Sequence, residues 1–297
     1  EMLEFDDYKW MSTLISAFSK SILNYHLWNT FDDRIALLKS EKMENYDAII
    51  ESLNKVQVRS QKELIHFSKE VLDIVISMVK HTGAVAMLGN HEYNYLAYWT
   101  KHRKSGKWLR PHNEDNDLQN KATRDSIGDD PYYLEFMNKL LIYERNPFFY
   151  AIHAHWDENS ISLIRKENLL ELGLDFLERS SDPDNHYFVA IEQIIKGPEI
   201  DIEKEDWFYD SSNKLRKRKR IEWWDSALML ELFDDPDKIS VLNRPIFFGH
   251  YSIKDVPHLI DKDICCLDFG DFKKEKYLTA YRWNGEMDLT DDNLIWV

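Results

Sequence analysis

The chain has very little cysteine, no long apolar run and no excess of positive charge. Its two cysteines, Cys265 and Cys266, are adjacent, which excludes a disulfide framework and is typical of a reducing compartment. No signal-peptide pattern is recognisable, and no apolar span is long enough to cross a bilayer. A formal net charge of −15 disfavours general affinity for nucleic acid or anionic membranes. We therefore expect a cytoplasmic protein that binds neither nucleic acid nor membrane.

The composition is that of a folded globule with a large core. The chain has 297 residues, of which 43% are hydrophobic and 13% aromatic. Apolar residues at spacings of three and four predict a helical N-terminal part over 1–55. A change in character over 158–240 indicates an inserted, cap-like region.

Apolar patterning predicts an α/β fold. A weak strand signal over 56–58, a helix over 62–80 and a buried strand over 84–88 form a predicted β-α-β unit, which implies a parallel pair. Further helices are expected over 132–143, 161–177 and 187–195, and a long loop with a short helix over 99–130. The tail predicts antiparallel strands over 264–269, 278–283 and 294–297, with Asn284-Gly285 as the hairpin turn between the last two.

Polar side chains follow three of the predicted buried strands. Asn90 and His91 come after 84–88, His153 after 148–152, and His250 after 245–248. Open α/β sheets place their sites at the carboxyl ends of strands. A lone histidine at a strand end is commonly structural, but three such ends in one sheet favour a site. One amide oxygen and two imidazoles are suitable ligands for Mn or Fe, and His91 beside them is placed to act as a general acid.

The one basic run of the chain covers residues 214–220 and is followed by Trp223 and Trp224. Two interpretations stay open for it. Runs of this kind usually form a solvated face. Basic residues beside aromatic ones also form local anion-binding sites, and the adjacent tryptophans favour that alternative.

The same motifs resemble those of the calcineurin-like metallophosphoesterases. Gly89–Glu92 is similar to the Asn-His-Glu motif of that family, His153 to its central histidine and Gly249-His250 to its C-terminal histidine. The closer resemblance is to the bacterial serine/threonine-phosphatase-like and diadenosine-tetraphosphatase-like branch, through the segments 152–157, 196–199, 247–251 and 280–283.

This resemblance implies a single domain over 1–297 with a four-layer α/β/β/α sandwich, a helical insertion and a C-terminal antiparallel β segment. It implies metal ligands at Asn90, His153 and His250 and a general acid at His91. The implied activity is hydrolysis of a phosphomonoester or nucleotide polyphosphate by metal-activated water. A phosphorylated small molecule or a phosphoprotein would then be the partner.

Two motifs of the family are missing. The chain contains no Asp-x-His and no Gly-Asp-x-x-Asp-Arg, and the positions that align with the second motif are Ser60, Glu63 and Leu64. Asn24-Tyr25-His26 is the nearest counterpart of the first. Without a bridging carboxylate the repulsion between two cations is not offset, so we expect one weakly held Mn or Fe ion.

Three hypotheses about the function of the chain follow. The first is a metal-dependent phosphoesterase. The second is a degenerate family member that binds a ligand or partner without turnover. The third is an ordinary enzyme whose first motifs are hidden by an incomplete N-terminal sequence. His155 is a further polar candidate beside His153, expected on the same side of its strand.

Overall fold

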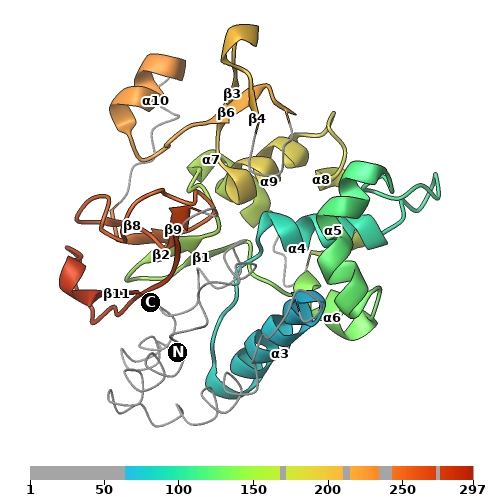
Figure 1. Cartoon of the computed structure of the whole chain (residues 1–297), viewed down its shortest axis with the longest axis horizontal. Helices are drawn as coiled ribbons and strands as arrows, with labels where there is room; N and C mark the ends of the chain where they lie inside the picture. The colour runs from blue at the N-terminus through green and yellow to red at the C-terminus, as the bar shows by residue number, and fades with distance from the viewer. Residues whose placement is uncertain (1–63, 168–171, 210–214, 234–242, 272–274, 297) are drawn as a thin grey trace.

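The computed structural model describes residues 64–167, 172–209, 215–233, 243–271 and 275–296 (Figure 1). Within these ranges the protein is a mixed α/β structure with eight α-helices and several small sheets. The predictions for residues 1–63 lie outside the described residues. They comprise the N-terminal helices, the strand over 56–58, the Asn24-Tyr25-His26 motif and the alignment of Ser60 and Glu63.

The central sheet has the strand order β1-β2-β7-β8, with bounds β1 Tyr143–Arg145, β2 Tyr150–Ile152, β7 Ile246–Phe248 and β8 Ile264–Cys266. Strands β2, β7 and β8 are parallel, and β1 is antiparallel to β2. The strands expected over 148–152 and 245–248 are therefore confirmed. The segment over 84–88 is largely buried, as predicted, but it pairs through a single parallel bridge between Met87 and Leu141.

The two faces of this sheet are buried against different partners, because alternate side chains of a strand point to opposite faces. On β7, Ile246 and Phe248 belong to the larger core, which contains residues of the helices. Phe247, between them, belongs to a second core with Tyr281 and Leu294 from the C-terminal strands. The sheet is thus enclosed on both faces, which explains why its strands are continuous apolar runs.

Seven helices, together with Met229 of an eighth helix described below, contribute to the larger core. Helix α3 packs on α5, whereas α7 and α8 both pack on α9 (Figure 1). None of the helices in the described ranges combines the length and apolarity needed to cross a bilayer. The seven are α3 Leu64–Thr82, α4 Asn90–Trp99, α5 Glu114–Ile127, α6 Pro131–Asn138, α7 Glu158–Arg165, α8 Gly173–Ser180 and α9 His186–Lys196.

The C-terminal strands form an antiparallel sheet in the order β11-β10-β9, as predicted for 278–283 and 294–297. The antiparallel strand expected over 264–269 is wrong in its first half, because Ile264–Cys266 is the parallel strand β8 of the central sheet. Their bounds are β9 Asp268–Asp271, β10 Glu275–Tyr281 and β11 Leu294–Trp296. The expected two-residue turn at Asn284-Gly285 is wrong. Strands β10 and β11 do pair, but the connection runs over 282–293 and includes the 3-10 turn Asp291–Asn293.

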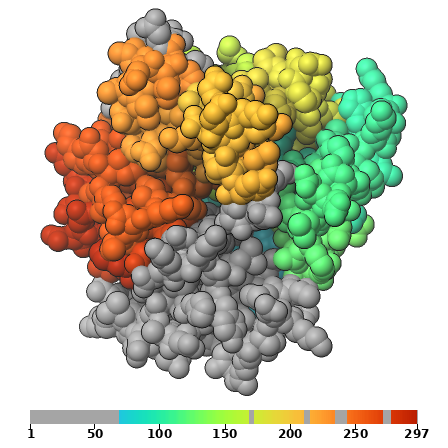
Figure 2. Space-filling view, turned by 45° about the horizontal axis from the view of Figure 1, so that its top comes forward, coloured from blue at the N-terminus to red at the C-terminus, as the bar shows by residue number. Residues whose placement is uncertain are grey.

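The region predicted as an insertion, 158–240, begins with α7, α8 and α9, and after α9 it carries two short ribbons and a further helix. Strand β3 (Glu199–Asp201) pairs with β6 (Arg218–Arg220), β4 (Phe208–Tyr209) pairs with β5 (Leu215–Arg216), and α10 covers Ser226–Phe233. The 3-10 turn Lys204–Asp206 lies between β3 and β4. Figure 2 shows this yellow-to-orange surface between the green surface of the α4–α6 region and the red C-terminal region.

Three helix predictions need correction. The segment over 99–130 contains a 14-residue helix, α5, because Asn113 caps it and acidic residues fill its first turn. The helix expected over 132–143 ends at Asn138, and Tyr143 already belongs to β1. The helix expected over 161–177 is two helices, and Gly173 at the start of the second has a φ of 65°. The helix over 187–195 is confirmed as α9.

Gly197 ends α9 at a crowded position, which generates a stability prediction. Its φ is 81°, and an added Cβ would lie 2.1 Å from Tyr251 Oη. Gly106 has a similar φ of 66°, but nothing lies within 4 Å of its added Cβ. We expect Gly106→Ala to lower the free energy of unfolding by about 1–2 kcal/mol through backbone strain alone. Gly197→Ala should cost about 2–3 kcal/mol more, because overpacking is added.

Urea unfolding of the two variants in parallel measures this difference. Equal losses in both variants would contradict the packing of Tyr251 against Gly197.

Candidate functional site

Three side chains from distant parts of the chain meet at the carboxyl edge of the central sheet. His153 Nε2 lies 3.2 Å from Asn90 Oδ1 and 3.2 Å from His250 Nδ1. The first contact joins residues 63 positions apart and the second residues 97 positions apart. Asn90, His153 and His250, predicted from the sequence as one group, are therefore together in space.

The fold explains this convergence. Strands β2 and β7 are parallel neighbours with Ala151 opposite Phe247, so His153 and Gly249 leave the sheet side by side. The Gly249 N–H donates to the His153 carbonyl at 2.9 Å and fixes that register. Asn90 arrives from the third side as the first residue of α4.

Gly89 allows α4 to approach His153 closely. A Cβ on Gly89 would lie 2.9 Å from His153 Cε1 and 2.6 Å from Glu92 Oε2, so no side chain fits there. Its φ of −93° is ordinary, and glycine is therefore required for space and not for backbone conformation. The apolar run over 84–88 thus ends in a glycine because two side chains fill the adjoining volume.

Glu92 is buried at the N-terminus of α4. Its position, three residues after the N-cap Gly89, is that from which a carboxylate accepts from the N-cap N–H. Hydrogen bonds from the backbone N–H groups of Gly89 and Glu92 favour the charged form, but burial outweighs them. The pKa of Glu92 is raised to about 7. Glu92 therefore serves the helix terminus and carries only a partial charge near neutral pH.

His250 is held in an unusual backbone conformation. Its φ is 71°, and that of Ser252 is 48°, both in the left-handed region that costs non-glycine residues energy. The buried Asp268 carboxylate accepts from the Ser252 N–H and Oγ, each at 3.0 Å, and the Ile253 N–H donates to the Asp268 carbonyl. Asp268 therefore holds the turn that carries His250. No sequence pattern indicates this role, because Asp268 lies inside the strand predicted over 264–269.

The His153 imidazole is neutral near physiological pH. Burial is the larger cause and the positive charge of Arg220 the smaller, and together they lower the pKa of His153 to about 3. A neutral imidazole is the form that binds metal ions. The environment of His153 therefore suits a ligand and does not suit a proton donor.

Arg220 brings a positive charge to the same edge. Its Nη1 donates to the His250 carbonyl at 3.3 Å, and its guanidinium lies 5.3 Å from the centre of the Tyr251 ring. Its Nε is buried without a hydrogen-bond partner. The other described residues of the basic run, 215–219, are exposed. The described part of the run is thus a solvated face, as the first interpretation expects, and it ends in one inward-facing arginine, whereas anion binding stays a prediction.

The two remaining candidates differ in their placement. His91, the second residue of α4, is partly exposed beside Asn90. His155 is buried, with its Nδ1 3.3 Å from Gln193 Oε1 and its ring 5.1 Å from that of Trp223. His155 therefore contacts α9 and the tryptophan and is not one of the three converging groups.

Two of the three separations within the trio match both hydrogen bonds and the spacing of ligands around one cation. Ligand atoms about 2.1 Å from a metal ion lie about 3.0–3.4 Å apart in octahedral or tetrahedral sites, which includes the two 3.2 Å separations. Within the described ranges, no group of three or more His, Cys, Asp or Glu side chains is arranged to hold a metal. The set is thus two imidazoles and one amide oxygen, without a carboxylate.

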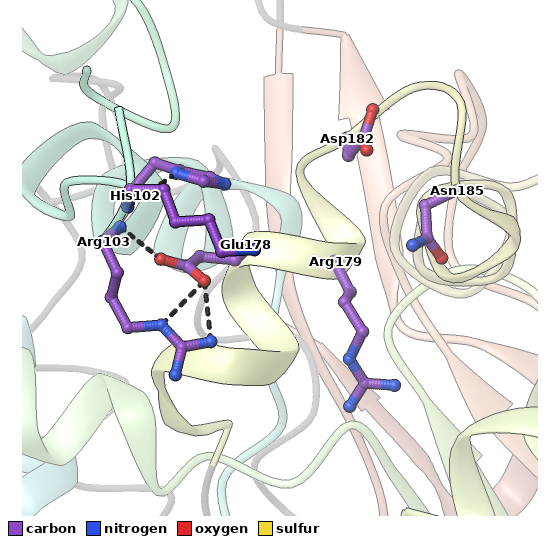
Figure 3. Close-up of a pocket in the computed structure, with 7 residues that line it drawn as sticks. His102, Arg103, Glu178, Arg179, Asp182 and Asn185 are labelled. Atoms are coloured by element: carbon purple, nitrogen blue, oxygen red, sulfur yellow. Dashed lines mark hydrogen bonds and ion pairs between the residues drawn. The ribbon is translucent and has the colours of Figure 1, made fainter. Parts of the chain in front are cut away.

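A pocket of about 410 Å³ lies elsewhere, between the loop after α4 and the end of α8 (Figure 3). Its seven lining residues include none of the converging trio. In Figure 3 Arg103 faces Glu178, and the two are joined by hydrogen bonds and an ion pair. Arg179 in the same wall pairs with Glu167. The arginines of this pocket are thus already neutralised by carboxylates.

Comparisons of the chain with protein-family models, with curated proteins and with solved structures find no match.

The raised pKa of Glu92 generates a pH prediction for protein treated with a chelator. Below the unfolded pKa of about 4.5, Glu92 is protonated in both states and costs nothing. Between about pH 4.5 and pH 7 the unfolded carboxyl ionises while the buried one keeps its proton, so the folded state loses about 3 kcal/mol of stability over this window and no more above it. Glu92→Gln keeps the hydrogen-bonding shape without the charge. The stability of the variant relative to the wild type should therefore increase by about that amount between pH 4.5 and pH 8.

Urea titrations of both proteins across this pH range measure the difference. A constant difference would contradict the burial of Glu92.

Proposed function

We propose that the protein is a divalent-metal phosphoesterase that acts on a phosphomonoester or a nucleotide polyphosphate. The observation that carries the proposal is the convergence of Asn90, His153 and His250 at the ends of two parallel strands and one helix. This is the place where a sheet of this kind holds its ligands. We also infer a four-layer α/β/β/α sandwich, supported by a central sheet with helices on one face and strands on the other.

In this proposal each residue has one role. Asn90, His153 and His250 hold a single Mn or Fe ion with one oxygen and two nitrogen donors. Such an ion, when bound, polarises a phosphoryl oxygen and lowers the pKa of a water molecule. Arg220 attracts the non-bridging oxygens of the substrate through its half-buried guanidinium. His91, partly exposed at the start of α4, donates the proton that the leaving oxygen needs.

A second candidate is binding without turnover. The specific observation that favours it is the composition of the trio, which no carboxylate of the described residues completes. A site with three neutral ligands leaves the charge of the cation uncompensated, and we expect it to bind the ion weakly. The same residues would then recognise a phosphorylated ligand or phosphoprotein without hydrolysing it.

A metal-binding experiment tests whether the trio is a set of metal ligands or only a structural cluster. We expect Mn²⁺ to raise the melting temperature of the wild type, because an ion that binds only the folded state stabilises it. Asn90→Ala and His153→Ala should each abolish this rise, since each removes one ligand. His258→Ala, which changes an exposed histidine, is the matched control and should keep it. A rise of equal size in all four proteins would contradict the assigned ligands.

Catalysis has its own test. The wild type should release phosphate from an aryl phosphate in the presence of Mn²⁺, and His91→Ala should lower the rate by about 10²–10⁴-fold through loss of the acid. His250→Gly should abolish turnover. Glycine is chosen because it adopts the φ of 71° freely, so the loss does not come from backbone strain.

The control is again His258→Ala, with turnover unchanged. Absence of turnover with every divalent metal, in a folded and metal-loaded wild type, would reject the phosphoesterase and leave the binding-only candidate.

A further inference from the structure

A second arginine, Arg110, lies next to the helix that supplies Asn90. Its Nη1 donates to Asn94 Oδ1 at 3.0 Å and its Nη2 to Gln119 Oε1 at 2.8 Å. Its backbone N–H donates to the Ala97 carbonyl of α4. The guanidinium Nε is buried without a hydrogen-bond partner. Arg110 is thus positioned firmly by neutral groups, while one of its donors has no acceptor.

Arg110 has no carboxylate of the described residues within ion-pair distance. Five other described arginines do form an ion pair with Asp or Glu, namely Arg103, Arg124, Arg145, Arg179 and Arg218. Three half-buried arginines of the described ranges bond instead only to neutral oxygens, namely Arg110, Arg220 and Arg244. The carboxylates whose charge acts on two of these guanidinium groups, Glu192 on Arg110 and Glu199 and Asp268 on Arg220, lie beyond ion-pair distance. A ligand that brings an anionic group into direct hydrogen-bonding contact is therefore favoured.

The three arginines lie at different places relative to the central sheet. Arg244 precedes β7 and bonds to the Pro147 carbonyl, which places it at the amino edge of the central sheet. Arg220 lies at the carboxyl edge with His250. Arg110 is bound to Asn94, which is four residues after Asn90 on α4. Residues four apart share one face of a helix, and they are separated along its axis by about 6 Å.

We propose that Arg110 binds a second phosphoryl group of the substrate, one helical turn from the phosphoryl group held at Asn90, His153, His250 and Arg220. This inference rests on the proposed function, because it takes the trio as the place of the reacting group. The favoured substrate class is then a small molecule with two phosphoryl groups about 6 Å apart, the separation of one helical turn. The planar fork of arginine suits a phosphoryl group, to which it donates two parallel hydrogen bonds.

A pair of non-hydrolysable ligands tests the proposal without requiring turnover. Titration calorimetry with the Mn²⁺-loaded full chain compares propylphosphonate with propane-1,3-diylbisphosphonate. We expect the wild type to bind the bisphosphonate about tenfold or more tightly, since a hydrogen bond to a charged group contributes about 1.5–3 kcal/mol. Arg110→Gln should reduce this preference to about twofold or less and leave the propylphosphonate affinity unchanged.

Two further variants make the result specific. Arg110→Lys keeps the charge but loses the fork, and it should retain part of the preference. Arg103→Gln is the matched control, because Arg103 lines the pocket of Figure 3 and is paired with Glu178. It should keep the full preference, and loss of the preference in this variant would overturn the proposal in favour of the pocket.

The stability of Arg110→Gln separates ligand binding from a structural tie between α4 and α5. A binding residue that forms no ion pair within the fold should leave the melting temperature close to that of the wild type. A lowered melting temperature with equal weakening of both ligands would overturn the proposal, as would an undiminished preference in folded Arg110→Gln.

Different results contradict the proposed phosphoesterase activity and the proposed role of Arg110. A wild type that turns over aryl phosphate but shows no preference for the bisphosphonate contradicts the role of Arg110 alone. A wild type without turnover that still shows the preference, and loses it in Arg110→Gln, contradicts catalysis and supports the second phosphoryl site. Failure of the wild type to bind either phosphonate contradicts both.

Discussion

The imidazole of His153 lies so close to Gly89 that a Cβ on residue 89 would clash with it. This close contact determines how the site is assembled. The N-terminus of α4 can approach β2 only because residue 89 has no side chain. The Gly249 N–H holds the His153 carbonyl from the other side, so three backbone segments are fixed around one buried ring. Burial, with a smaller contribution from the positive charge of Arg220, lowers the pKa of His153 to about 3, which keeps the ring neutral. Packing and ligand chemistry are therefore two results of the same contact.

The surroundings of this ring carry features that stability alone does not explain. His250 occupies a backbone region that non-glycine residues avoid, and the buried Asp268 holds the turn in place. Arg220 and Arg110 are half-buried and bond only to neutral oxygens. Backbone strain and partly buried charges without an ion pair persist where the surrounding structure enforces them, and such positions cluster at functional sites. The proposed binding of one cation and two anionic groups gives His250, Arg220 and Arg110 a role each.

Strand ends could be predicted from the sequence, whereas the lengths of helices could not. Asn90, His153 and His250 each follow an apolar run, and parallel strands bring such ends to one edge. The α5 helix was predicted too short because its strong N-terminal signals lie in a polar segment with little apolar periodicity. The helix over 132–143 was predicted too long because the apolar residues 140–142 continue its pattern into β1.

Local sequence patterns do not identify residues whose roles depend on contacts with distant parts of the chain. Arg220 is one of several basic residues in a run, and only its contact with His250 separates it from the exposed members. Asp268 and Glu92 lie inside predicted apolar or motif segments, and their roles depend on which backbone N–H groups surround them. Arg110 is placed by α4 and α5 together. Such roles depend on contacts between distant segments, which local sequence patterns do not record.

The central claim is that Asn90, His153 and His250 are ligands of one cation. Anomalous diffraction from crystals grown with Mn²⁺ tests it most directly. The account predicts one anomalous peak about 2.0–2.2 Å from Asn90 Oδ1, His153 Nε2 and His250 Nδ1, the atoms that face one another in the structure. A well-ordered trio at its present spacing with no peak, or a peak bound by other residues, would contradict the claim.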